Sequence, residues 1–140
     1  MIDLRVMMNI NIPNIPFADA SFDAILCNHV LERIPDDGKA MRELYRVLKP
    51  NGWAILQVHL DNNLAETFED PQITSESDRI KFYGQKDHVR LYGQDYKNRL
   101  EAGFQVQVHD YIQELGTDLA EKYRLVSEDT NTEDVYFCTK

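Results

Sequence analysis

The sequence of 140 residues has few cysteines, an excess of acidic over basic side chains and no long apolar run. Its two cysteines, Cys27 and Cys138, lie far apart in apolar segments, which predicts buried thiols rather than a zinc site. Lysine and arginine number 15 against 24 aspartate and glutamate, a formal net charge of −9. Because nucleic-acid binding depends largely on basic side chains that neutralise phosphates, this balance argues against a nucleic-acid partner.

No stretch approaches the roughly 18 apolar residues of a membrane-spanning helix, so no membrane association is expected. Asp3 and Arg5 stand where a signal peptide would be apolar, and the sequence therefore predicts a cytoplasmic protein. Hydrophobic residues make up 43% and charged residues 28%, values typical of a soluble domain. The length predicts a single domain over residues 1–140.

The first half of the chain has the pattern of strands around one helix. Short apolar runs predict buried strands at 4–12, 22–27 and 53–58, and the run at 22–27 is typical of a parallel strand covered on both faces. Apolar side chains recur at helical spacing after Asp36 and Asp37, and residues 49–52 (KPNG) predict the end of that helix. A helix between two strands favours a parallel crossover.

The second half is more polar. Residues 61–92 form a long connection without a sustained period, and such connections often serve as lids or binding loops. Tyr92, Tyr96 and Leu100 predict a short helix whose stripe packs into the core. Alternation at 104–108 predicts a half-exposed strand at the sheet's edge, 113–133 reads as irregular with one helical turn, and 135–139 predicts a last strand.

Residues 11–58, NIPNIPFADASFDAILCNHVLERIPDDGKAMRELYRVLKPNGWAILQV, resemble the C-terminal part of the class I S-adenosylmethionine-dependent methyltransferase domain, in its type 11 small-molecule branch. The segment YGQKDHVRLYGQDYKNRLEAGFQVQV at 83–108 and the ending DVYFCTK are similar to the same branch. The resemblance implies an α/β fold with a partial Rossmann-like sheet. That sheet is mostly parallel with an antiparallel last strand, and it lacks the first two strands of the family.

The resemblance also implies a site for S-adenosylmethionine. Asn11 stands where the family has an acidic residue that faces the adenine, and Ile12 follows it. Asn28, His29 and Val30 match the positions that line the methionine part and the reacting methyl group. The resemblance further suggests a substrate lid containing His88, Arg90 and Tyr92. No catalytic residue is assigned, and no metal ligand is expected.

Several positions depart from the family pattern. Arg33 and His59 stand where the branch commonly has a histidine and a proline, and the first ten residues contain no glycine-rich loop. By resemblance, the chain is a truncated methyltransferase domain. Two functions follow: a methyltransferase acting on a small molecule, or a non-catalytic remnant that serves as a subunit or interaction module and does not bind S-adenosylmethionine alone. Whether this chain is an enzyme is thus left open.

Without the family's first strand, the strand at 22–27 would have an open edge, which favours association. We therefore expect either that residues 4–10 pair with it or that a homodimer or another partner chain covers it.

Simpler interpretations stand beside the functional ones. His29 either faces the cofactor or is a satisfied histidine at a strand end. Arg90 either holds a substrate anion or pairs with Asp87 or Asp95 within the connection. Three acidic residues of the first helix predict capping and a solvated face rather than catalysis: Asp36, Asp37 and Glu43. His59 and His109 are each predicted to be ordinary strand-end residues.

Overall fold

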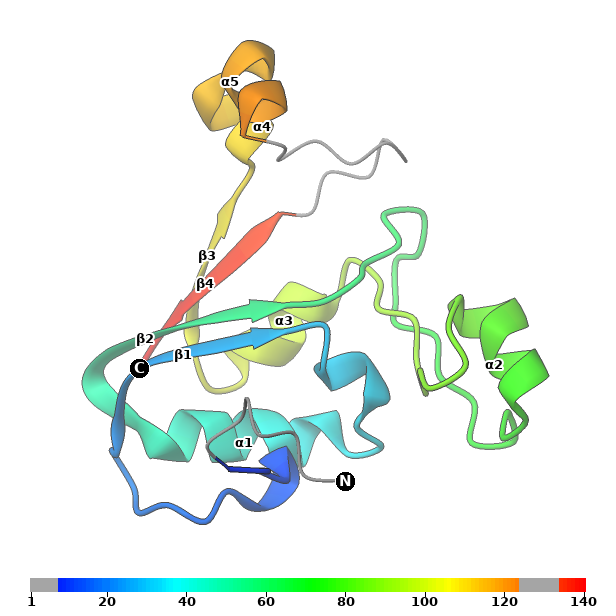
Figure 1. The fold of residues 1–140 in the computed structure, drawn as a ribbon, viewed down its shortest axis with the longest axis horizontal. Coiled ribbons are helices and arrows are strands. Elements are labelled where there is room, and N and C mark those ends of the chain that lie inside the picture. The colour runs from blue at the N-terminus through cyan, green and yellow to red at the C-terminus, as the bar shows by residue number, and fades with distance from the viewer. Residues whose placement is uncertain (1–7, 124–133) are drawn as a thin grey trace.

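A computed structural model describes residues 8–123 and 134–140. Four strands form one sheet in the order β1-β2-β4-β3 (Figure 1). β1 and β2 are parallel, whereas β4 is antiparallel to both of its neighbours. The prediction of an α/β sheet with an antiparallel last strand is confirmed. The bounds are β1 Phe22–Asn28, β2 Leu48–Gln57, β3 Gln105–His109 and β4 Val135–Thr139.

Helix α1, Asp37–Val47, connects β1 to β2. It begins at Asp36, whose side chain accepts a hydrogen bond from the Lys39 amide, as expected for an N-cap. The helix ends at Val47, directly before the stop signal predicted at 49–52, but β2 starts at Leu48, earlier than the strand predicted at 53–58. Pro50 is tolerated in this strand because the pairing with β1 is irregular there, and a residue without an N–H fits an irregular ladder.

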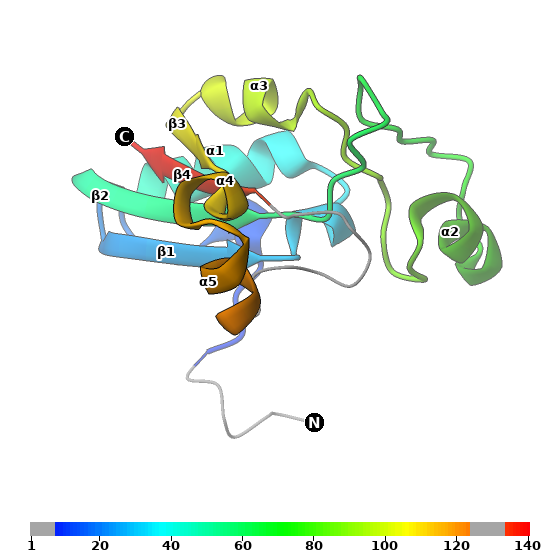
Figure 2. The ribbon, with the colours of Figure 1, turned by 90° about the horizontal axis from the view of Figure 1, so that it is seen from above.

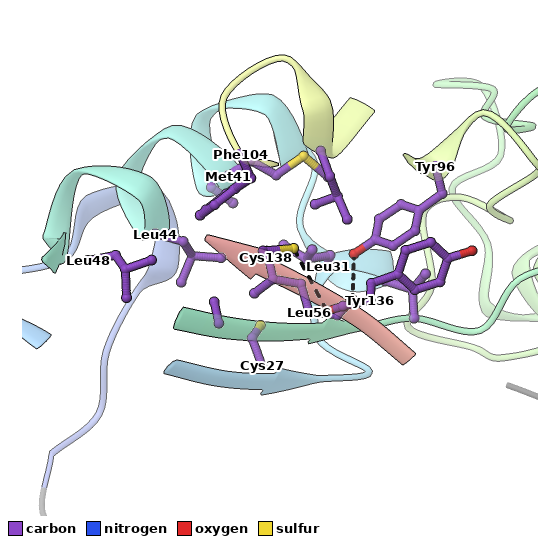
Figure 3. Packing of buried hydrophobic residues seen from close by; sticks show 14 of the residues in the cluster. Cys27, Leu31, Met41, Leu44, Leu48, Leu56, Tyr96, Phe104, Tyr136 and Cys138 are labelled. Atoms are coloured by element: carbon purple, nitrogen blue, oxygen red, sulfur yellow. Dashed lines mark hydrogen bonds between the residues drawn. The ribbon is translucent and has the colours of Figure 1, made fainter. Parts of the chain in front are cut away.

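Helices α1 and α3 (Tyr96–Glu101) cover one face of the sheet, as Figure 2 shows from above. Ala54 and Leu56 of β2 are fully buried against them. Figure 3 shows Leu56 among the core side chains. The Tyr96 hydroxyl donates to the Leu56 carbonyl at 2.9 Å, which satisfies a polar group inside this core. Because side chains alternate between the two faces of a strand, every second side chain of β2 packs against the helices.

Both cysteines lie within this core and are free thiols, as predicted. Burial raises the pKa of Cys27 to about 11 and that of Cys138 to about 12. Thiols with a raised pKa stay protonated near neutral pH and are poor nucleophiles and metal ligands. The cysteines therefore contribute packing rather than reactivity.

The opposite face of the sheet carries exposed apolar side chains. Leu26 of β1 is 67% exposed and Trp53 of β2 is 37% exposed. The Trp53 ring stacks on Phe137 of β4 with centroids 6.0 Å apart. The prediction that 22–27 is covered on both faces is therefore wrong, because α1 and α3 both pack on the other face.

The prediction of a strand at 4–12 is wrong wherever the structure describes it. Residues 8–11 have no regular structure, and Ile12–Asn14 form a short 3-10 helix, η1. Pro13 in this turn has no N–H to donate to a ladder. Within 8–123 and 134–140, β1 pairs only with β2, so residues 8–10 do not cover its edge. Residues 4–7 lie outside the described part.

The connection from 61 to 92 contains a helix that the sequence pattern missed, α2 at Glu76–Tyr83. Ser75 caps its start by accepting from the Asp78 amide, and Gly84 ends it at φ +83°, a conformation that favours glycine. These two signals could have located it. Helix α3 starts at Tyr96 rather than at Tyr92, because Tyr92 forms an isolated bridge with Leu60.

After β3, the chain forms α4 at Tyr111–Leu115 and α5 at Thr117–Lys122, where one helical turn was predicted. Residues 124–133 of that polar segment lie outside the described part. No helix in the described ranges is long and apolar enough to cross a membrane.

Candidate functional site

A cavity of about 340 Å³ lies at the carboxyl ends of β1 and β2, facing the end of α2. This is the end of a parallel sheet at which α/β proteins generally bind ligands. The cavity is lined by histidines from three segments, by Arg33 and by the turn that ends α2: His29, Arg33, His59, Tyr83, Gly84, Gln85 and His88. His59 thus belongs to the site, although the sequence predicted only an ordinary strand end.

His29 follows the last residue of β1 and has φ +54°, in the left-handed region. A residue other than glycine in this region carries strain of about 1–3 kcal/mol, and such strain concentrates at functional sites. The His29 amide donates to the Gln57 carbonyl at 2.8 Å, which fixes this turn to the end of β2. Its imidazole lines the cavity.

Glu32 lies behind the cavity in the 3-10 helix η2, Leu31–Arg33, and has no solvent exposure. Its Oε1 accepts from the His59 amide at 2.5 Å and lies 3.6 Å from His29 Nδ1. Its Oε2 has no hydrogen-bond partner. A buried carboxyl oxygen without a partner is destabilising, so this arrangement calls for a functional explanation.

His88 reaches the cavity from the long connection and is 4% exposed. Burial lowers its pKa, which the neighbouring Glu32 and Asp87 only partly oppose. Its Nδ1 has no partner, and neither has Oε1 of Gln57, the last residue of β2. With Glu32 Oε2, these are the only buried side-chain atoms without a partner in the part of the chain that the structure describes. All three belong to this end of the sheet.

We call His29, Glu32, His59 and His88 the cavity cluster. A second set of polar residues, the anchor cluster, lies beside it and differs in having its hydrogen bonds made: Asp37, Glu69, Arg90, Tyr92 and Arg99.

Arg90, a predicted lid residue, is almost fully buried in the anchor cluster. Its Nε donates to Glu69 at 3.0 Å, and its two Nη atoms donate to the carbonyls of residues 31, 34 and 35 at 2.5 to 2.9 Å. It is therefore a staple, but not to Asp87 or Asp95 as the simpler interpretation predicted. Those residues instead pair with Arg33 and Arg99, each at 3.1 Å.

Tyr92, another predicted lid residue, is fully buried and donates its hydroxyl to Asp37 Oδ2 at 2.8 Å. Burial, followed by the nearby Asp37, raises the pKa of the Tyr92 hydroxyl. The same Asp37 oxygen accepts from Arg99 at 3.0 Å. The prediction that Asp37 lies on a solvated face is wrong, because these contacts bury it. Of the three lid candidates, only His88 lines the cavity.

Glu43, also predicted to lie on a solvated face of α1, is half-buried there and makes contacts that the sequence did not predict. It accepts from the Ile15 amide at 3.0 Å and from Arg46 at 2.8 Å. These hydrogen bonds lower the pKa of Glu43 to about 2. Glu43 thus holds the segment before β1 against the helix. His109, by contrast, lies at the far end of β3 and contacts Glu114 at 2.9 Å.

The predicted cofactor residues fall into two places. Asn28 is exposed at the end of β1, and the half-buried Val30 packs against the core beside His29. Asn11 is exposed before η1 and does not cap it, and Ile12 packs against the core. η1 lies beside α1 rather than at the cavity wall (Figure 1). Among the described residues, no group of three or more acidic, histidine or cysteine side chains could hold a metal ion.

Comparison with known proteins adds to this geometry. Residues 4–56 match a family model described as a methyltransferase domain. The chain is 43% identical over 54 residues to the 2-phytyl-1,4-naphtoquinone methyltransferase of Nostoc, covering 38% of this chain and 24% of that protein. It is 30% identical over 89 residues to the arsenite methyltransferase of Aquipseudomonas alcaligenes, covering 63% and 23%. The match spans about a quarter of these relatives' length.

The fold is similar over most of the chain to that of the 1,6-didemethyltoxoflavin-N1-methyltransferase of Burkholderia thailandensis, whose structure holds 1,6-didemethyltoxoflavin and S-adenosylhomocysteine. The TM-score is 0.53 at 13% identity, covering 92% of this chain and 48% of that one. The sheet order and the parallel β1–β2 pair are consistent with the methyltransferase domain that residues 4–56 match. Residues 4–56 thus match a methyltransferase domain, and the fold of most of the chain is similar to that of a solved methyltransferase.

Proposed function

We propose that the carboxyl ends of β1 and β2 bind S-adenosylmethionine and that the adjoining cavity holds a small molecule that receives its methyl group. The observation that carries this proposal is that, in the described part of the chain, all three buried side-chain atoms without a partner lie at this end of the sheet, near a strained His29. Buried polar atoms in native proteins are otherwise hydrogen-bonded, so atoms left without partners here are available to a ligand.

The residues present suit the cationic part of this cofactor. Gln57 Oε1, at the end of β2, is an oxygen acceptor without a partner, and the cofactor carries positive charge on its sulfonium and amino groups. We assign Asn28, His29 and Val30 to the methionine part and Asn11 and Ile12 to the adenine side. The bound cofactor supplies an electrophilic methyl group. The protein's own contribution is to orient the two reactants, which can lower a barrier by roughly 7–11 kcal/mol where the orientation is tight.

For the acceptor, a hydroxylated aromatic ring is favoured over arsenite. A cavity of about 340 Å³ is large enough for one or two fused rings, and imidazoles line it. Trivalent arsenic is a soft centre that binds thiolates, and both cysteines of this chain are buried thiols with a raised pKa. A reduced naphthoquinone is therefore the first acceptor to test.

Calorimetric titration with S-adenosylhomocysteine tests the proposal directly. Micromolar binding is expected for the chain, and Asn28→Ala should weaken it at least about fivefold through the loss of one hydrogen-bonding side chain. Asn98→Ala on the exposed side of α3 is the matched control and should bind like the parent. Failure to bind at millimolar ligand would refute the proposal and favour the non-catalytic module.

We further propose that a second chain, in the simplest case another copy, covers β1. Support comes from the position of β1 at the edge of the sheet and from its exposed Leu26. Leu26→Lys should shift sedimentation toward the monomer and speed amide exchange in 22–28. Leu119→Lys on α5, which is also an exposed leucine, should change neither. A monomeric parent chain with fast exchange in β1 would contradict this proposal.

A further inference from the structure

The wall of the cavity brings together three imidazoles that are far apart in the sequence. His29 follows β1, His59 follows β2 and His88 comes from the long connection. Arg33, which also lines the cavity, is paired with Asp87 at 3.1 Å. A wall of imidazoles next to a bound electrophile can accept protons as well as bind.

Glu32 is placed to act on these imidazoles rather than on the ligand. It does not line the cavity, it has no solvent exposure, and its Oε1 lies 3.6 Å from His29 Nδ1. One backbone amide, that of His59, fixes the same oxygen at 2.5 Å. A single backbone hydrogen bond could be accepted equally by a neutral glutamine, so it does not explain why an acidic side chain is buried here.

We infer that Glu32 is a positioning residue that keeps the proton of neutral His29 on Nδ1, so that Nε2 of His29 accepts a proton from the methyl acceptor. This inference rests on the proposed function. The nitrogen of a histidine that carries the proton is set by the group facing the other nitrogen, and an acidic oxygen near Nδ1 favours the Nδ1–H form. The charged or titratable residues that line the cavity together with His29 are Arg33, which pairs with Asp87, and His59, Tyr83 and His88.

The inference names the acceptor class as a molecule with an acidic hydroxyl on an aromatic or enolic carbon. Its O–H bond breaks, and the proton passes to His29. The electron pair left on the acceptor forms the bond to the methyl carbon, either from the oxygen or from a conjugated ring carbon, which afterwards loses its own proton to solvent. The pair of the broken carbon–sulfur bond returns to the sulfonium sulfur, so charge and electrons balance.

The first test is the tautomer of His29, read from the nitrogen chemical shifts of its imidazole. We expect the Nδ1–H form to dominate in the parent chain and Glu32→Gln to move the population toward Nε2–H, the form that a solvated histidine side chain prefers. The glutamine keeps an oxygen for the His59 amide, so the local fold is preserved. Glu114→Gln beside His109 is the matched control and should alter only the spectrum of His109. An unchanged His29 spectrum in Glu32→Gln would overturn the inference.

The second test is methyl transfer to a reduced naphthoquinone. Glu32→Gln should lower kcat about tenfold with little change in KM, because it alters proton transfer and not acceptor binding. His29→Asn should lower kcat about 100-fold or more, and asparagine tolerates the left-handed conformation at this position. Transfer at the parent rate in both variants overturns the inference while leaving the proposed function intact. Failure of the parent chain to bind S-adenosylhomocysteine overturns the proposed function, and with it this role for His29.

Discussion

The anchor cluster and the cavity cluster lie side by side, yet they differ in how many of their buried polar atoms are hydrogen-bonded. In the anchor cluster, Arg90 alone makes four hydrogen bonds, and Asp37 accepts from both Tyr92 and Arg99. In the cavity cluster, one oxygen of Glu32 and one nitrogen of His88 are buried without any partner. Both clusters use the turn after β1. Its carbonyls accept hydrogen bonds from the anchor cluster, and its side chains belong to the cavity cluster.

This difference separates a structural role from a binding role. A satisfied buried network stabilises the native state, and removing one member leaves the others uncompensated. An unsatisfied one destabilises the free protein, and a bound ligand can recover that loss. Substitutions should therefore affect stability strongly in the anchor cluster and weakly in the cavity cluster.

The largest effect is expected for Arg90→Met. Removing the guanidinium leaves three carbonyls without their donor and takes one partner from Glu69, in a site with almost no exposure. The free energy of unfolding should fall by about 3–5 kcal/mol, measured by urea denaturation. Lys86→Met, on an exposed position nearby, is the control and should stay within about 0.5 kcal/mol of the parent. A small loss for Arg90→Met would contradict the structural role.

A smaller loss should follow from Tyr92→Phe. The ring packing remains, but the hydroxyl that donates to Asp37 is lost, while Arg99 still pairs with that oxygen. The expected destabilisation is roughly 1.5–3 kcal/mol, the range for a hydrogen bond to a charged group. Tyr123→Phe on an exposed ring provides the comparison and should be neutral. Equal stability of the two variants would show that the Tyr92 hydroxyl contributes nothing.

Glu43 and Arg46 are paired like the anchor cluster but lie within reach of solvent, so their effect should be smaller. The pKa of Glu43 falls from 4.5 to about 2 on folding. Its contribution is therefore present above pH 4.5 and lost progressively as the pH falls toward 2. In Glu43→Gln, stability should decrease less steeply as the pH falls through that window. Thermal melts at a series of pH values measure this. Glu121→Gln should leave the curve unchanged, and a parallel response of the two would argue against this linkage.

The smallest effect on stability is expected within the cavity cluster. His88→Leu removes a buried nitrogen that has no hydrogen bond to lose, so the free energy of unfolding should change by less than about 1 kcal/mol in either direction. The same urea titration that is used for Arg90→Met measures it. A loss comparable with that of Arg90→Met would mean that His88 belongs to the structural network, and the contrast between the clusters would fail.

Local patterns in the sequence were enough to predict the part of the fold built from β1, α1 and β2, and the last strand. Apolar runs and the Asp36 cap specify these elements through short-range physics. They did not specify how far each run is covered: Leu26 has the composition of a core residue, but α1 and α3 both pack on the other face. The strand predicted at 4–12 failed where Pro13 turns the chain into η1.

The candidate site was predictable at a strand end and, through the family resemblance, at His88 of the long connection. Asn28, His29 and Val30 come immediately after an apolar run, so their position is a local property. The roles of Arg90 and Glu32 depend on contacts between segments 56 and 27 residues apart, to Ile34 and to His59. Sequence spacing contains no information on such contacts, which explains why Arg90 was predicted in the lid and Glu32 was not singled out.

The four hydrogen bonds of Arg90 also divide the long connection into two parts with different freedom to change. Arg90 is hydrogen-bonded to residues 31–35, so the sequences of this part of the connection and of the turn after β1 must change together. Helix α2 lies outside these hydrogen bonds. It exposes Ile80 and Phe82, and only its final turn lines the cavity. Under the proposed function, substitutions there would alter the cavity mouth and leave the cofactor end untouched, so the acceptor preference could diverge while the methyl donor stays the same.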